Sequence, residues 1–140
     1  MKIPDGLLTY GDMKYRNKKC PPESAEQITF FNELRKLYPD TLGKIAVHIR
    51  NEGNKTFNQH KKEKAEGLVK GASDISIPGC PSFVCELKKR DHTESQWQSG
   101  QIEYLEAAKA NGAFVCVAFG YLAALEAVSV WIAISTTKNG

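Results

Sequence analysis

The sequence predicts an α/β fold in which a mixed sheet carries helices on both faces. Two long segments, near 24–38 and 95–111, have the apolar spacing of amphipathic helices, and a third helical segment follows residue 120. The segments between them are short and either alternating or wholly apolar, which is typical of strands. The expected order is helix, strand, strand, strand, helix, strand, helix, and it implies a sheet covered on both sides.

The first helix is expected to run from Glu23 or Ser24 to about Tyr38. Ser24 is suited to cap its start, and Pro39 ends it. One side of the helix is apolar and consists of Ile28, Phe31, Leu34 and Leu37. This helix therefore has one face for the core.

The middle of the chain is expected to hold three strands and a short charged helix. Residues 45–50 alternate between apolar and polar side chains, as in a half-buried strand. A polar loop follows, and a charged helix over residues 60–69 ends before Gly71. The apolar runs 75–77 and 83–88 flank a turn rich in proline and glycine, which predicts a hairpin.

The second long helix is expected from about Ser95 to the residue before Gly112, since glycine commonly follows the last helical residue. Residues 113–119 are almost wholly apolar, which predicts a buried central strand. A final helix is expected from about Tyr121 to Trp131 or beyond. Its apolar C-terminal part fits core burial better than a dimer contact, although a homodimer is compatible with it.

The length of 140 residues fits one domain. We expect a single domain over residues 22–135, an irregular N-terminal arm over 1–21 and a tail over 136–140. The first residues lack the apolar core of a signal peptide, and no apolar run reaches the roughly 20 residues that span a bilayer. The expected location is therefore the cytoplasm.

Neither the cysteines nor the net charge identifies a function. The four cysteines contain no C-x-x-C pair and the three histidines are scattered, so neither a zinc site nor a disulfide framework is expected. The formal net charge of +3 is too small to indicate nucleic acid by itself. Cations nevertheless gather on both sides of the predicted hairpin, at Lys61, Lys62, Lys64, Lys70, Lys88, Lys89 and Arg90. They suit a polyanion there, or are simply solvated faces of loops and helices.

The chemistry-bearing residues converge on the predicted hairpin. Side chains alternate along a strand, so Glu86 and Lys88 share one face while Cys85 and Leu87 share the other. The hairpin is able to bring Asp74 beside Glu86, which places two carboxylates and an ammonium near one point. Such a cluster suits a hard divalent cation.

Several short motifs follow one another along the chain. They are Pro22-Glu23-x-x-x-Gln27, Ile49-Arg50-Asn51-Glu52-Gly53, Lys64-Ala65-Glu66-Gly67-x-x-x-Gly71-x-Ser73-Asp74, Phe83-x-x-Glu86-Leu87-Lys88, and Gln101 eleven residues before Gly112. Taken together and in order, they resemble the VRR-NUC branch of the PD-(D/E)XK nuclease superfamily. The resemblance covers about residues 22–131, and its order and spacing are specific while each piece alone is not. Ser73 stands where that family usually has its name-giving proline, and Arg50 stands where another proline is expected.

The resemblance implies a restriction-endonuclease-like αβββαβα core and a metal site of Mg²⁺ or Mn²⁺. Asp74, Glu86 and the backbone carbonyl of Leu87 would bind the metal. Lys88 would orient or deprotonate the attacking water and stabilise charge on the phosphate. Glu23 would complete the acidic shell; Glu26, one helical turn away, is its rival for that role.

Further residues receive roles through the same resemblance. Gln101 would hydrogen-bond the attacking water or a phosphate oxygen, although an exposed helix glutamine is an equally good interpretation of this residue alone. Asn51, Lys64 and Lys70 would contact the nucleic-acid backbone.

The resemblance implies a metal-dependent DNA endonuclease that hydrolyses phosphodiester bonds. A small stand-alone member of this branch, of phage or bacterial type, suggests branched DNA such as a Holliday junction as substrate, and a homodimer as the geometry for cutting two strands. Two alternatives stay open: a sequence-specific restriction-type endonuclease, and a nucleic-acid-binding module that keeps the fold without cutting.

Overall fold

The computed structural model describes residues 1–49 and 56–139. The strands are β1 (Leu8–Tyr10), β2 (Val47–His48), β3 (Ile75–Ile77), β4 (Phe83–Lys88) and β5 (Phe114–Phe119). The α-helices are α1 (Glu23–Leu37), α2 (Leu42–Ile45), α3 (Phe57–Ala65), α4 (Gln101–Ala110) and α5 (Tyr121–Asn139), and a short 3-10 helix, η1, spans His92–Glu94.

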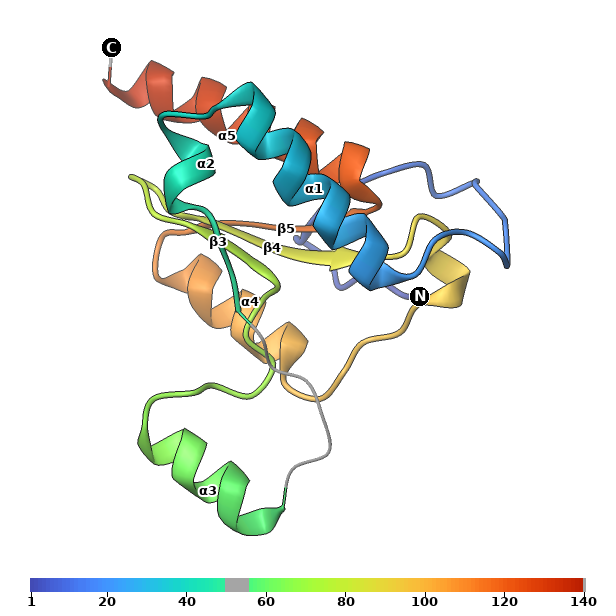
Figure 1. Cartoon of the computed structure of the whole chain (residues 1–140), viewed down its shortest axis with the longest axis vertical. Coiled ribbons are helices and arrows are strands. Elements are labelled where there is room, and N and C mark those ends of the chain that lie inside the picture. The colour runs from blue at the N-terminus through green and yellow to red at the C-terminus, as the bar shows by residue number, and fades with distance from the viewer. Residues whose placement is uncertain (50–55, 140) are drawn as a thin grey trace.

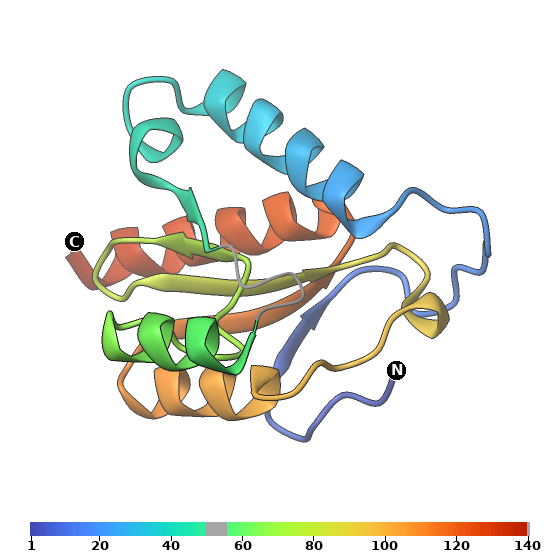
Figure 2. The same cartoon turned by 60° about the horizontal axis from the view of Figure 1, so that its bottom comes forward.

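The strands form a mixed five-stranded sheet in the order β1-β5-β4-β3-β2. The β1, β5 and β4 strands run parallel, whereas β3 pairs antiparallel with β4 and β2 pairs antiparallel with β3. The α1 and α5 helices cover one face of the sheet and α4 covers the other, as Figures 1 and 2 show. The predicted α/β class, with a mixed sheet and helices on both faces, is present.

The central strand β4 is buried along its whole length, and its side chains divide between two cores. Cys85 and Leu87 belong to the larger core, together with residues of α1 and α5. Val84 belongs to a smaller core with Leu105 of α4. Because alternate residues of a strand point to opposite faces, Glu86 also points to the α4 side. A carboxylate is thereby placed on the buried face that a single helix covers.

Strand β1 lies inside the segment expected to be an irregular arm. It pairs in parallel with β5, where Leu8 is the partner of Cys116 and Tyr10 the partner of Ala118. Three residues are too few for a period to stand out in the sequence, and the parallel partner lies at the other end of the chain. The segment is held further by a hydrogen bond of 2.8 Å from the Trp97 indole N–H to the Lys2 carbonyl.

Two other elements differ in their bounds from the sequence-based expectation. Of the strand expected over residues 45–50, the described part up to residue 49 contains only β2, because the short helix α2 ends only at Ile45; residue 50 lies outside the described residues. The charged helix begins earlier than expected, at Phe57, because Thr56 caps it. The Thr56 hydroxyl accepts the N–H of Gln59 at 3.2 Å, and the Gln59 side chain accepts the N–H of Thr56 at 2.9 Å.

Helix α1 begins at Glu23 as expected, but its cap and the start of α4 depart from expectation. Ser24 does not cap α1: Pro22 occupies the cap position, and no side-chain cap bond is formed there. Helix α4 begins at Gln101 rather than near Ser95, because η1 and an extended linker precede it and Gly100 adopts a left-handed φ of 90°. Gln101 is therefore the first residue of its helix.

Helix α5 continues well past Trp131 and anchors the hairpin. The Trp131 indole N–H donates to the Pro81 carbonyl at 2.8 Å, and its ring packs against Phe83 with a centroid distance of 5.4 Å. Val128 and Trp131 are buried, whereas Val130 and Ile134 are partly exposed. This part of α5 belongs mainly to the core. Among the described residues, no helix is long and apolar enough to cross a membrane.

Candidate active site

Three carboxylates from distant parts of the chain meet beside the central strand β4. Glu86 comes from β4, Asp74 precedes β3, and Glu23 is the first residue of α1. One carboxylate oxygen from each lies within 4.8 Å of the others. Glu86 is fully buried and Asp74 is 9% exposed. The three acids form an oxygen-only ligand set that a divalent cation is able to bind.

Asp74 is fixed by hydrogen bonds on both its side chain and its backbone. Its carboxylate accepts the backbone N–H of Leu87 at 3.0 Å, which ties the start of β3 to β4. Its carbonyl accepts the N–H of Ile49 at 3.1 Å and lies 2.9 Å from Nδ1 of His48. Sequence reasoning assigned no role to His48. The only sequence pattern that points to His48 is the alternation of apolar and polar residues around β2. This alternation places His48 on the polar face, beside the next strand.

Lys88 and Gln101 complete a hydrogen-bonded network around Glu86. The Lys88 ammonium donates to Gln101 Oε1 at 3.0 Å and lies 3.7 Å from Glu86 Oε1. Gln101 Oε1 also accepts the N–H of Gln98 at 2.8 Å, so its amide nitrogen faces the acid and donates to Glu86 at 2.9 Å. These contacts orient Glu86 through one oxygen.

The linker before α4 supplies two contacts to Lys88 that sequence reasoning missed. The ammonium donates to the Gln96 carbonyl at 3.1 Å and lies 5.8 Å from the centroid of the Trp97 ring. Lys88 is only 2% exposed, so these groups replace part of its hydration. An irregular linker has no periodicity from which such contacts are predicted.

Two glycines bring the Asp74 loop and the Gln101 helix together. Gly71 has a left-handed φ of 81°, and a Cβ atom built on it would lie 2.2 Å from the backbone carbon of Gly100. Only glycine allows this backbone contact. The contact places the segment leading to Asp74 directly against the start of α4, where Gln101 begins.

The environment of Glu86 disfavours its charged form. Burial is the largest cause that raises the pKa of Glu86; the charge of Asp74, a hydrogen bond to Asp74 and the charge of Glu23 add to it, Lys88 opposes the shift, and together they bring the pKa to about 10. As a carboxylate, its Oε2 atom has no donor among the described residues. A bound cation would satisfy this oxygen and relieve the repulsion among the acids.

The structure separates the two acids that compete for the third position. Glu26 is buried and accepts the N–H of Tyr121 at 2.6 Å, which caps the start of α5. Glu23 belongs to the acidic cluster with Asp74 and Glu86. The geometry therefore gives Glu26 a structural role at the α1–α5 contact.

An open cleft of about 1140 Å³ leads to the acids. Asp74, Lys88 and Gln101 lie along it, and so do Lys64 and Lys70, the lysines expected to contact nucleic acid. Asn51, the other residue expected to do so, lies outside the described residues. The cleft thus joins the acidic cluster to two of the three predicted contact residues.

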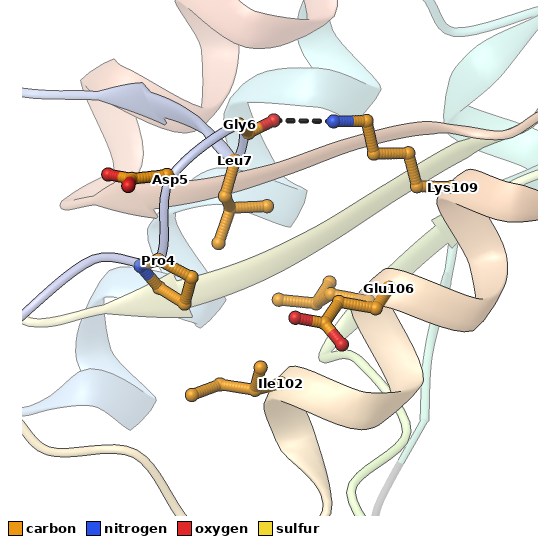
Figure 3. Close-up of a pocket in the computed structure, with 8 residues that line it drawn as sticks. Pro4, Asp5, Gly6, Leu7, Ile102, Glu106 and Lys109 are labelled. Carbon is orange, nitrogen blue, oxygen red and sulfur yellow. Dashed lines mark hydrogen bonds between the residues drawn. The ribbon is translucent and has the colours of Figure 1, made fainter.

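A much smaller pocket of about 40 Å³ lies between the N-terminal segment and α4. Figure 3 shows its lining, with the Lys109 ammonium donating to the Gly6 carbonyl at 2.6 Å. None of the predicted site residues lines this pocket. It is a packing gap beside β1 rather than part of the acidic site.

Comparison with known proteins supports the fold. No family model matches the sequence, and no curated protein matches it. Among solved structures, the chain is similar to a protein described as a VRR_NUC domain protein, with a TM-score of 0.67 and 21% identity. The match covers 81% of this chain and 90% of the other. The chain has the VRR-NUC fold. The fold predicted from the sequence is thereby confirmed.

The raised pKa of Glu86 predicts how the stability of the metal-free VRR-NUC fold depends on pH. The folded state retains the proton while the unfolded state loses it, so the stability contributed by Glu86 is present below about pH 4.5 and is lost as pH rises toward 10. Glu86→Gln should remove this loss and, at pH 8, raise the free energy of unfolding by a few times the roughly 1.4 kcal/mol that one pKa unit represents.

Urea unfolding in EDTA at pH 5, 7 and 9 measures this effect. The exposed Glu103 on α4 provides the matched control, and Glu103→Gln should follow the wild-type pH dependence. Parallel pH profiles for wild type and Glu86→Gln would contradict the assignment of a desolvated carboxylate.

Proposed function

We propose that this protein is a phosphodiesterase that cuts DNA with the help of Mg²⁺ or Mn²⁺. The observation that carries the proposal is a buried acidic pair, Asp74 and Glu86, with the Lys88 ammonium 3.7 Å from Glu86. Two carboxylates beside a cation at the end of a cleft form a set of groups suited to phosphoryl transfer. The VRR-NUC fold supports the same conclusion.

The residues present fit a hard divalent cation. Glu23, Asp74 and Glu86 offer only oxygen ligands, and Glu86 Oε2 lacks a donor among the residues that the structure describes. We assign the Leu87 carbonyl as a further ligand, because this residue lies between Glu86 and Lys88 and its N–H already bonds Asp74. When bound, the metal would lower the pKa of a water and neutralise negative charge on the phosphate.

Lys88 and Gln101 have complementary roles in this proposal. Lys88 carries the positive charge that orients the attacking water and offsets charge developing on the phosphate. Gln101 holds both Lys88 and Glu86 by hydrogen bonds and presents a polar amide at the cleft. Its role is to keep the acid and the ammonium at a fixed separation and to bind the water or a phosphate oxygen.

The proposed substrate is DNA, with branched forms such as a Holliday junction as the favoured shape. Lys64 and Lys70 on the cleft walls are suited to phosphate contacts, and we include Asn51 in the same role. Cutting both strands of a junction would call for a homodimer. A restriction-type endonuclease and a non-cutting binding module are the competing functions.

The proposal is tested by incubating labelled four-way junction, flap, single-stranded and linear duplex DNA with Mg²⁺ or Mn²⁺. We expect cleavage of the branched substrates that depends on the metal and is abolished by EDTA. Cleavage restricted to one duplex sequence would favour the restriction-type function. Binding without cleavage of any substrate would favour the non-cutting module.

Substitution of the central residues should separate catalysis from folding. Asp74→Asn, Glu86→Gln and Lys88→Ala should each lower the cleavage rate by about 10²-fold or more, since each removes a charge at the reacting phosphate. Asp74→Asn retains an acceptor for the Leu87 N–H, so DNA binding and the circular dichroism spectrum should persist. A wild-type rate in any of the three variants would contradict the mechanism.

The two acids of α1 provide a matched pair. Glu23→Gln should weaken metal-dependent cleavage while leaving thermal stability almost unchanged, because Glu23 belongs to the acidic cluster. Glu26→Gln should lower stability by about 1 kcal/mol, because it loses a charged acceptor at the start of α5, and should retain cleavage. The reverse pattern in cleavage rates and melting temperatures would exchange the two roles.

A further inference from the structure

Helix α3 presents one side to the cleft and contributes nothing to either core. Phe57, His60 and Lys64, at positions i, i+3 and i+7 of the helix, all line the cleft. None of the residues of α3 is buried, and Figure 1 shows this helix set apart from the sheet. A nine-residue helix is too short to be stable by itself, and the Thr56 capping box stabilises its first turn. We call Phe57, His60, Lys61 and Lys64 the α3 platform.

Phe57 is the feature of the platform that the cleavage chemistry does not explain. Its side chain is 78% exposed, and no other large hydrophobic side chain among the described residues is as exposed. The Lys61 ammonium lies 5.9 Å from the centroid of its ring. An exposed aromatic ring with a neighbouring cation is the combination that binds an unpaired base and its phosphate.

The platform and the acidic cluster share one cleft. The same cleft is lined by Asp74, Lys88 and Gln101 on the sheet side and by Phe57 and Lys64 on the α3 side. Its volume of about 1140 Å³ exceeds the roughly 300–1,000 Å³ of pockets that enclose small molecules, so it suits a stretch of polymer. A strand that passes along the cleft would meet both walls.

The lysines near Phe57 favour nucleic acid over an apolar protein segment. Lys64 and Lys70 line the cleft, as do Glu23 and Asp74 of the acidic cluster, and Lys61 lies beside the ring. Glu63 is the acidic residue of α3 on the same cleft. Lysines next to an aromatic ring suit alternating phosphates and bases, whereas a protein partner would match the apolar ring but not these cations.

We propose that the α3 platform binds an unpaired nucleotide, with the base stacked on Phe57 and the adjacent phosphates on the lysines. This inference rests on the proposed function, because it concerns the DNA that enters the same cleft. A base inside an intact duplex has its faces covered by its neighbours and cannot stack on a side chain. The platform therefore selects single-stranded or splayed DNA over continuous duplex.

The test measures the binding of a fluorescein-labelled oligothymidine strand and of a matched duplex by fluorescence anisotropy, with the full chain in EDTA so that nothing is cut. Phe57→Ala should weaken binding of the single strand by about tenfold and binding of the duplex by less than about twofold. Phe57→Trp should bind the strand as wild type does, and its added indole fluorescence should be quenched by the strand.

The control is Leu122→Ala, which removes an apolar side chain of α5 that is 63% exposed and lies away from the cleft. It should bind both DNAs as wild type does. An unchanged affinity of Phe57→Ala for the strand, or an equal loss on strand and duplex, would overturn the platform. A change in oligomeric state on size-exclusion chromatography caused by Phe57→Ala would also overturn it, because the ring would then be covered by a second copy.

Cleavage assays distinguish failure of this inference from failure of the proposed function. If the wild type cuts no DNA but strand binding still depends on Phe57, the catalytic proposal fails and the platform stands. If the wild type cuts DNA while Phe57→Ala binds the strand normally, the platform alone fails.

Discussion

The design of the site follows from one constraint: the Glu86 carboxylate lies in a wholly buried central strand, where removing its charge from water costs free energy. A buried charge needs polar partners in place of water. Gln101 donates to Glu86 Oε1, and the Lys88 ammonium lies 3.7 Å from the same oxygen. Glu86 Oε2 has no donor among the described residues. Burial, together with the nearby charges of Asp74 and Glu23, raises the pKa of Glu86 to about 10. The acidic cluster therefore lowers the stability of the metal-free protein. A bound cation would offset this loss, which is expected if Glu86 is a metal ligand.

The arrangement of the site follows from a few backbone constraints rather than from many side-chain contacts. The β3–β4 hairpin brings Asp74 to the N–H of Leu87, and the left-handed conformations of Gly71 and Gly100 let the two segments touch through backbone atoms. This contact holds the start of α4, so that Gln101 at the first position of the helix reaches Glu86. In contrast, α3 makes no contribution to the core, and so it is free to serve the cleft as a binding surface.

The site could be predicted from the sequence where the information was local. Alternation along β4 showed that Glu86 and Lys88 share a face, and the turn composition indicated that Asp74 returns beside them. Glu23 and Glu26 could not be separated by the same means, because they lie one helical turn apart and only the position of α5 assigns the second of them. Strand β1 and the linker that holds Lys88 were missed for a related reason: both are ordered by tertiary contacts and carry no periodic pattern.

The central claim, that the buried acids exist to bind a divalent cation, is tested most directly by calorimetric titration of Mn²⁺ into the full chain without DNA. Wild type should show saturable binding, and Glu86→Gln should show none, because the carboxyl group with the unpartnered oxygen can release its proton to become an anionic ligand and an amide cannot. Absence of Mn²⁺ binding to wild type, or equally tight binding to Glu86→Gln, would contradict the account.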